Sequence, residues 1–142
     1  DIDGNLRSLS SLEGRKNAIV VFWSPNCGHC MRELPQVQQF YLSKRMEYDF
    51  EVFAITRASG SAGRKQVQSL VRDKMFTFPV LIDEDGKVSD DYGVRYVPSV
   101  YFIDKKGTVV EVIIGGSRHF SLVYNSIFRD PTRLGEKPGK DG

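Results

Sequence analysis

Residues 18–35 of the chain read AIVVFWSPNCGHCMRELP, and this stretch decides the fold class. Its first six residues form a continuous apolar run rich in β-branched side chains, which predicts a strand buried on both faces of a sheet. The segment 24–26 breaks this strand, and apolar residues then recur at spacings of three and four. That spacing predicts a helix from residue 27 or 28 to about 47, with a kink at Pro35.

The rest of the chain continues this alternation. A predicted strand at 50–55 is followed by a loop of small residues at 59–63, with a helix cap at Ser61, and by a helix through Val67, Leu70 and Val71. A strand at 79–82 and a short helix at 88–92 come next. Two strands at 100–103 and 109–114, joined by a turn at 104–107, precede an amphipathic helix over 120–128. Alternating strands and helices imply parallel strands, and the last two strands imply an antiparallel hairpin. We therefore expect an α/β protein with three layers and a mixed central sheet.

A single domain accounts for the length of the chain. It has 142 residues, a hydrophobic fraction of 40% and no internal repeat, which fits one core. We expect this domain over residues 1–130, with a turn at residues 3–5, and a loose polar tail over 131–142. The first residue is Asp1 rather than Met, so we expect a trimmed or processed product from which an upstream signal or anchor is missing.

Composition argues against two classes of function. The net charge is +2, and Lys and Arg are scattered among nearly as many acidic residues. This pattern does not favour nucleic-acid binding, which requires clustered basic residues. No apolar run approaches the roughly 20 residues that a membrane-spanning helix needs.

Cys27 and Cys30 form a Cys-x-x-Cys pair with three interpretations: half of a zinc site, a redox pair or two inert thiols. Structural zinc takes four ligands, whereas the chain holds two Cys and two His, and His29 lies between the cysteines. At a helix N-terminus, unpaired amide groups and the helix dipole favour a thiolate on Cys27, and a thiolate is the attacking species in disulfide exchange. Cys30 follows one turn later, where it can resolve a mixed disulfide. We therefore favour the redox pair and expect no metal.

The active-site segment resembles that of the thioredoxin superfamily. Residues 22–30 match its Trp-x-x-x-Cys-x-x-Cys frame, with Asn26 where thioredoxins carry Trp. Pro35 matches the kinking proline of the family, and residues 96–98, Tyr-Val-Pro, look like its cis-proline loop. The order of elements is similar over residues 16–129. The resemblance implies a thioredoxin-like fold and dithiol–disulfide exchange without a cofactor.

Within the superfamily, the chain is more similar to the TlpA/ResA-like branch of extracytoplasmic thiol–disulfide oxidoreductases. Residues 30–35 resemble its Cys-x-x-Glu-x-Pro motif, and residues 61–82 look like its central helix-strand insertion. Val21 stands where thioredoxins keep a buried Asp. This likeness implies a reductase in the periplasm or cell envelope. It also implies protein dithiols or disulfides as substrates and a membrane or soluble thiol protein as redox partner.

In this scheme Cys27 is the nucleophile and Cys30 the resolving thiol, and three neighbours each have two interpretations. Glu33 either tunes Cys30 or relays its proton, or else it is a first-turn acid that stabilises the helix N-terminus. His29, together with Gly28, either raises the reduction potential by favouring the Cys27 thiolate or simply faces solvent.

Three further residues are expected to contribute to substrate binding. Pro98 is expected to be cis, which would leave the backbone of Val97 free to pair with an extended substrate. The alternative is an ordinary trans proline at the start of a strand. Trp23 either packs against the active-site loop or belongs only to the core, and His119 is expected at the surface.

Other functions on the same scaffold remain as alternatives. A peroxiredoxin-like peroxidase needs Ser or Thr three residues before its reactive Cys, which Ser24 satisfies, and a Pro four residues earlier, where the chain has Val20. The Gly28-His29 dipeptide between the cysteines favours a more oxidising disulfide than the one in thioredoxin. A disulfide oxidase or isomerase therefore remains an alternative function. A Sco-type copper module has a different cysteine spacing and needs a distal His, for which His119 is poorly placed.

Overall fold

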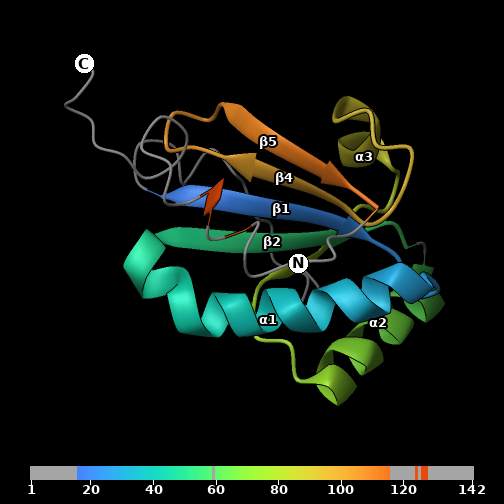
Figure 1. Ribbon diagram of the computed structural model, residues 1–142. Helices are drawn as coiled ribbons and strands as arrows, with labels where there is room; N and C mark the ends of the chain where they lie inside the picture. The colour runs from blue at the N-terminus through green and yellow to red at the C-terminus, as the bar shows by residue number, and fades with distance from the viewer. Residues whose placement is uncertain (1–15, 59, 116–123, 125, 128–142) are drawn as a thin grey trace.

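β1 (Asn17–Trp23) is the middle strand of a five-stranded sheet, and all seven of its residues are buried. The structure, a computed structural model, describes residues 16–58, 60–115, 124, 126 and 127. The order of the strands is β3-β2-β1-β4-β5, as Figure 1 shows. The other strands are β2 (Phe50–Thr56), β3 (Val80–Ile82), β4 (Ser99–Ile103) and β5 (Val109–Ile114). β1, β2 and β3 are parallel, whereas β4 is antiparallel to both β1 and β5, so the predicted mixed sheet is confirmed.

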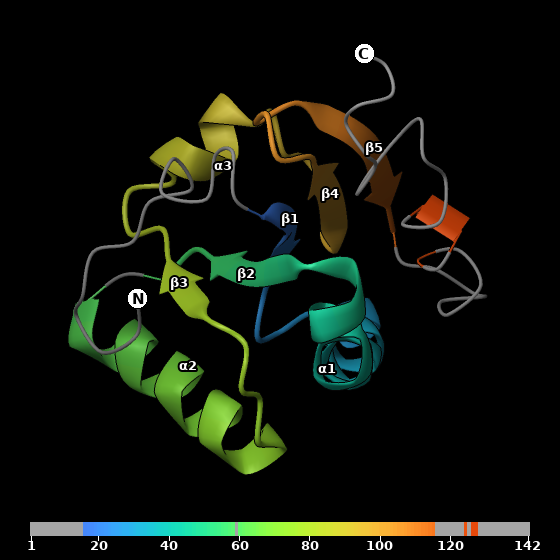
Figure 2. The ribbon, with the colours of Figure 1, turned by 90° about the vertical axis from the view of Figure 1, so that its left-hand side faces the viewer.

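Helices cover both faces of this sheet (Figure 2). α1 (Gly28–Tyr48) and α2 (Gly60–Lys74) lie on one face, and α3 (Lys87–Asp91) lies on the other. β1 serves both faces because its side chains alternate: Val21 joins the core beneath α1, and Val20 joins the core on the α3 side. Each fully buried aliphatic side chain contributes about 1.5–3 kcal/mol, so β1 anchors both layers.

α1 carries the two cysteines at its start and packs against the sheet. It continues through Pro35 and ends at Asp49, whose left-handed backbone (φ 54°) stops the helix. Its buried side chains, which include Leu34 and Val37, face the core at helical spacing as predicted. The kink expected at Pro35 stays a prediction.

The expected loop at 59–63 and the cap at Ser61 are wrong, because α2 begins at Gly60 and includes both Ser61 and Gly63. The small residues permit close packing instead of forming a loop. A Cβ atom added to Gly63 would lie 3.2 Å from the Cβ of Ala58, so only a small residue lets the helix approach this segment. α2 and β3 together form the predicted insertion, in which β3 adds a parallel edge strand beside β2.

Three aromatic rings fix α3 to the sheet. Phe22, Tyr92 and Tyr101 pack with ring centroids 5.0–5.6 Å apart, and the Tyr101 hydroxyl donates to the Tyr92 carbonyl at 3.1 Å. The loop that leads from α3 to β4 starts at this cluster. Its last residues, 94–98, are thereby brought to the end of the sheet where β1 stops.

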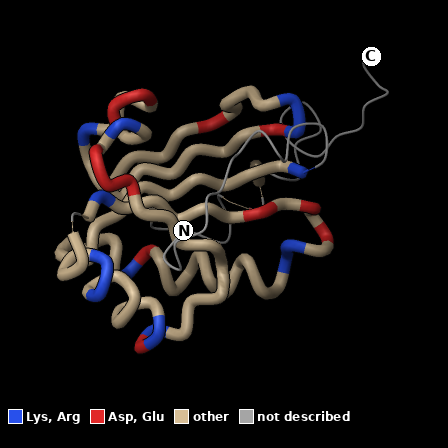
Figure 3. The backbone as a smooth tube through the Cα atoms, turned by 180° about the vertical axis from the view of Figure 1, so that it is seen from behind, with Lys and Arg blue, Asp and Glu red and all other residues tan. Residues whose placement is uncertain are grey.

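Charges of both signs are interspersed along the described backbone, as Figure 3 shows. No described helix is both long enough and apolar enough to cross a membrane. Of the helix predicted over 120–128, the structure describes Tyr124, Ser126 and Ile127, which are helical. The turn at residues 3–5, His119 and the tail at 131–142 lie outside the described residues.

Candidate redox site

Cys27 is the N-cap of α1. Its backbone is extended (φ −102°, ψ 115°), and its Sγ accepts the Cys30 N–H at 3.1 Å. Its own N–H donates to the Ser24 carbonyl at 3.1 Å, which closes the turn between β1 and α1. The sulfur therefore lies at the positive end of a 21-residue helix, where a negative charge on it is favoured.

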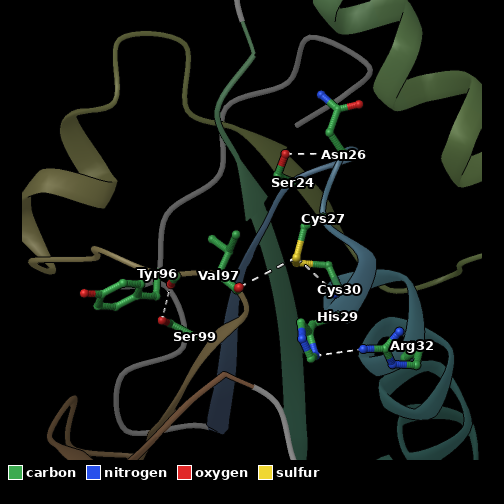
Figure 4. Close-up of a disulfide and its surroundings, with 9 residues drawn as sticks. All are labelled: Ser24, Asn26, Cys27, His29, Cys30, Arg32, Tyr96, Val97 and Ser99. Atoms are coloured by element: carbon green, nitrogen blue, oxygen red, sulfur yellow. Dashed lines mark hydrogen bonds between the residues drawn. A yellow bond between two sulfur atoms is a disulfide. The ribbon is translucent and has the colours of Figure 1, made fainter.

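A disulfide joins Cys27 to Cys30, whose Cα atoms are 5.2 Å apart. The two cysteines differ in exposure: Cys27 is half-buried, whereas Cys30 is completely buried. Figure 4 shows the disulfide with Cys27 on the side of the loop that carries Val97. Only Cys27 of the pair is thus accessible to a protein substrate.

The predicted cis peptide between Val97 and Pro98 is confirmed. The Cys27 Sγ lies 3.6 Å from the Val97 carbonyl oxygen, so this loop borders the disulfide directly. A disulfide sulfur carries no proton, and the same contact becomes a hydrogen bond when Cys27 is a thiol. Pro98 continues the β4–β5 pairing, since its carbonyl accepts the Gly115 N–H at 2.8 Å. Among the described residues, no backbone group pairs with Val97.

Glu33 is a buried acidic residue of α1. It is one turn after Cys30 on the same helix and is only 2% exposed. The Tyr124 hydroxyl donates to Glu33 Oε2 at 3.2 Å, across 91 residues of sequence. Glu33 follows the first turn of α1, which contains no acidic residue, so its interpretation as a first-turn acid is wrong. Its role toward Cys30 stays a prediction.

Tyr124 was recognised in the sequence only as part of an apolar stripe. Complete burial raises its pKa well above the usual value of 10.0, and the charge of Glu33 and the hydrogen bond to it raise it further. Tyr124 therefore stays protonated and donates to the buried carboxyl group. Sequence periodicity predicts burial of Tyr124, but carries no signal for this partner.

His29 is exposed, and its Nδ1 lies 2.9 Å from Arg32 Nη2. Figure 4 shows the ring turned toward Arg32. Gly28 is also exposed, and a Cβ atom added there would meet nothing within 4 Å. The tuning roles of His29 and Gly28 stay predictions.

Trp23 supports the site from below. It is 2% exposed and belongs to the core cluster that contains Cys30, and Cys27 packs against that cluster. Its indole N–H is buried without a partner among the described residues. Trp23 is thus a core residue that also supports the active-site loop, and substrate binding by it stays a prediction. Val21, where thioredoxins keep an acid, is completely buried in the same cluster.

The active-site loop is also tied to α2. The Gln66 side chain donates to Asn26 Oδ1 at 3.5 Å, a contact that sequence reasoning did not predict because the residues are 40 positions apart. Within the described part of the chain, no three His, Cys, Asp or Glu side chains are grouped so that they could hold a metal ion.

The chain is similar in sequence to known thiol–disulfide oxidoreductases. The sequence profile of the AhpC/TSA family matches residues 1–112. The thiol-disulfide oxidoreductase ResA of Halalkalibacterium halodurans is 32% identical over 116 residues, which cover 82% of this chain and 63% of ResA. The chain spans slightly less than two thirds of the length of the curated relatives that it matches first.

Two solved structures are similar over most of their length. MTB dsbF, solved in mixed oxidised and reduced forms, is 30% identical with a TM-score of 0.73, and the match covers 87% of each chain. The pneumococcal exposed lipoprotein thioredoxin Etrx1 of Streptococcus pneumoniae strain TIGR4 is 26% identical with a TM-score of 0.71, over 87% of this chain and 92% of Etrx1. The sheet and the redox helix of this chain are therefore shared with proteins of thioredoxin-like fold.

Proposed function

Since this chain belongs to the AhpC/TSA family and has a thioredoxin-like fold, we propose that it is a thiol–disulfide oxidoreductase acting on protein substrates. One observation carries the proposal: the Cys27–Cys30 disulfide lies at the N-terminus of α1, with Cys27 half-exposed beside the Val97 carbonyl. This arrangement favours a thiolate and exposes a single sulfur, and an extended substrate backbone would pair beside that sulfur.

The exchange takes place in two steps. In the reduced protein, the Cys27 thiolate attacks one sulfur of a substrate disulfide; a Cys27–substrate disulfide forms, and the other substrate sulfur leaves as a thiolate and takes up a proton. Cys30 then loses its proton and attacks Cys27 Sγ, which releases the second substrate thiolate. Two electrons pass from the protein dithiol to the substrate, and the reverse sequence oxidises a substrate dithiol.

Val97 and Pro98 are proposed to bind the substrate backbone. Because the N–H and C=O of Val97 have no backbone partner among the described residues, an extended peptide can pair with them. Pro98 lacks an N–H and is buried, so the pairing is restricted to Val97. A peptide held there lies next to Cys27 Sγ.

Glu33 is proposed to accept the proton of Cys30 in the second step. Cys30 is completely buried and Glu33 is 2% exposed, so bulk water has little access to the thiol. The carboxyl group follows one helical turn after Cys30, and Tyr124 holds its Oε2 atom. A buried base with a fixed orientation suits this proton transfer.

We propose the reducing direction on one ground. A buried carboxylate one helical turn after Cys30 disfavours a second negative charge on sulfur, and a destabilised thiolate makes the dithiol a better reductant. The name of Etrx1 describes an exposed lipoprotein, which supports a site outside the cytoplasm for this chain. A membrane or soluble thiol protein would supply the electrons.

An equilibrium titration of the full chain against dithiothreitol, with glutathione as a second couple, tests the function. Trp23, the single Trp of the chain, packs in the core beside Cys30 and reports the redox state by fluorescence. We expect a two-electron transition with a midpoint below about −250 mV. A midpoint above about −180 mV would indicate an oxidase or isomerase. Cys30→Ser is the control, and a wild-type chain as insensitive as this variant would refute the proposal.

The peroxidase alternative has weaker support. The position at which a peroxiredoxin needs Pro is Val20, a completely buried residue inside β1. Cys27 is bonded to Cys30 in the next turn rather than held alone. Peroxide consumption by the reduced wild-type chain, compared with that by Cys27→Ser, distinguishes the two activities. We expect the wild type and the variant to consume peroxide at the same rate.

A further inference from the structure

A pocket of about 270 Å³ opens at the carboxyl ends of β1 and β2, and one of its lining residues is Val97, whose carbonyl borders Cys27. Phe22 and Ile55 form its floor on the face of the sheet that α3 covers, and the α3–β4 loop forms its wall. The ends of β1 and β2 and the helix α3 lie at the same end of the molecule in Figure 1. The pocket also includes Val97, so it adjoins the proposed pairing site for substrate backbone.

The pocket is positively charged. Arg57 and Arg95 line it, no Asp or Glu does, and neither arginine forms an ion pair with a described residue. Ser24, Thr56 and Ser89 also belong to the lining. Two guanidinium groups at one pocket match a carboxylate, which accepts several charge-assisted hydrogen bonds.

Arg57 is held at the pocket by the turn that precedes α3. Its guanidinium group lies over Gly86, where an added Cβ atom would collide with it, and the backbone there is left-handed (φ 74°). The three acidic residues of this turn have other partners. Asp83 accepts the Val88 and Ser89 N–H groups, Asp85 accepts the Lys87 N–H at 3.0 Å, and Glu84 pairs with Arg64 at 3.1 Å. The charge of Arg57 therefore remains available to the pocket.

The size of the pocket indicates what occupies it. Sites for whole small molecules range from about 300 to 1,000 Å³, and this pocket is smaller and open to solvent on the substrate side. A single side chain of a bound peptide suits it better. A peptide paired with Val97 is extended, at about 3.3 Å per residue, so a residue within about three positions of the substrate cysteine can reach the pocket.

We propose that this pocket is a specificity subsite for an acidic side chain, Asp or Glu, that lies within about three residues of the reactive cysteine in the substrate protein. This inference rests on the proposed function and names the substrate class. Arg57 and Arg95 bind the carboxylate, and Val97 fixes the register of the peptide. Substrates with an acidic residue near the cysteine are thereby preferred over neutral ones.

The test uses synthetic peptides whose single cysteine carries an uncharged 2-hydroxyethyl disulfide. Asp or Asn is placed at each position from three residues before to three after the cysteine, and reduction by the full chain is followed by Trp23 fluorescence. We expect the Asp peptide to react about three- to tenfold faster than the Asn peptide at one or two positions, an advantage that shrinks as salt rises. In the double variant Arg57→Gln/Arg95→Gln the ratio falls to about one.

Arg72→Gln/Lys74→Gln is the matched control, because both residues are exposed in the last turn of α2 and neither lines the pocket. This variant removes two positive charges, as the double arginine variant does. This variant should keep the wild-type ratio. A wild-type ratio of one at every position, or the same ratio in the double variant as in the wild type, would overturn the subsite.

A binding measurement separates the subsite from the chemistry. Fluorescein-labelled peptides with Ser in place of Cys cannot exchange, and their anisotropy with the oxidised chain reports affinity alone. We expect the Asp peptide to bind about three- to tenfold more tightly than the Asn peptide, and only in chains that keep both arginines. If no peptide is reduced, the proposed function fails, and this affinity ratio still decides the subsite.

Discussion

Two cysteines three residues apart acquire different properties from one helical turn. Cys27 is the N-cap and keeps an exposed edge beside Val97, whereas Cys30 faces the core and is completely buried. The division of roles between attacking and resolving sulfur therefore follows from geometry rather than residue type. The same turn directs Glu33 into the core and leaves His29 outside, in contact with Arg32.

Glu33→Gln should change the titration of the cysteine pair in the reduced chain. Removal of a buried acidic group near Cys30 favours its thiolate, so we expect the titration of the cysteine pair to move to lower pH. Ultraviolet thiolate absorbance against pH measures this shift for the pair as a whole. Glu47→Gln, at an exposed position of the same helix, is the control. Identical curves for Glu33→Gln and the wild type would contradict a role of Glu33 at the thiols.

α1 is the element that carries the site, and its position depends on contacts far from the cysteines. Gln38 is buried in the middle of this helix and makes two hydrogen bonds to Thr77, in the segment before β3. It accepts the Thr77 N–H at 2.9 Å and donates to the Thr77 hydroxyl at 2.8 Å. The insertion formed by α2 and β3 is thus joined directly to the redox helix.

Gln38→Ala should destabilise the chain by about 1–3 kcal/mol, because the Thr77 N–H loses its partner in a partly buried position. Denaturant unfolding at neutral pH measures the free energy of unfolding. Gln39→Ala changes an exposed neighbour and should stay within about 0.5 kcal/mol of the wild type. Equal losses in the two variants would show that the contact with Thr77 contributes nothing specific.

For the whole molecule, the two faces of the sheet are organised differently. The face beneath α1 and α2 holds the larger apolar cluster, which includes the site residues Trp23 and Cys30 and extends to Tyr124 near the end of the chain. The α3 face holds a smaller cluster around Phe22, which borders the pocket. The proposed subsite thus lies mainly on the α3 face of β1, whereas Cys30 lies on the α1 face. Trp23, at the end of β1, belongs to the cluster of the redox pair and also lines the pocket.

Buried tyrosines predict alkaline unfolding of the whole chain. Burial raises the pKa of Tyr124 well above 10.0, and it also raises that of Tyr41 and Tyr92. Below pH 10 these groups are protonated in both states, so the stability that they contribute is fully present. Above pH 10 the unfolded chain ionises first, and the completely buried Tyr124 lowers the free energy of unfolding by up to about 1.4 kcal/mol per pH unit. Tyr41 and Tyr92 add to this decline in the same direction.

Tyr124→Phe should flatten this alkaline decline, although loss of the hydrogen bond to Glu33 costs about 1 kcal/mol at neutral pH. Tyr96→Phe, at an exposed tyrosine, is the control and should keep the wild-type pH dependence. Unfolding by denaturant at several pH values between 7 and about 11 gives both curves. An unchanged alkaline slope in Tyr124→Phe would contradict the assignment.

Local sequence patterns predicted most of the helices and strands, because each of these elements depends on residues that are close together in the sequence. The apolar run of β1, the helical spacing in α1 and the turn before β5 each specify their element within a short window. The start of α2 was mispredicted because small residues are common both in loops and in closely packed helix starts, and only the contact of Gly63 with Ala58 decides between them. The cysteine pair was found for the same local reason.

The strand–helix order, the Cys27–Cys30 pair at a helix N-terminus and the Val-Pro loop can be predicted from the sequence, since each depends on residues close together in the chain. The contacts between distant side chains require the folded structure: Tyr124 with Glu33, Gln38 with Thr77, and Arg57 with Arg95 in one pocket. Single charged or polar residues have no periodicity, so their partners are set by how the sheet brings distant segments together.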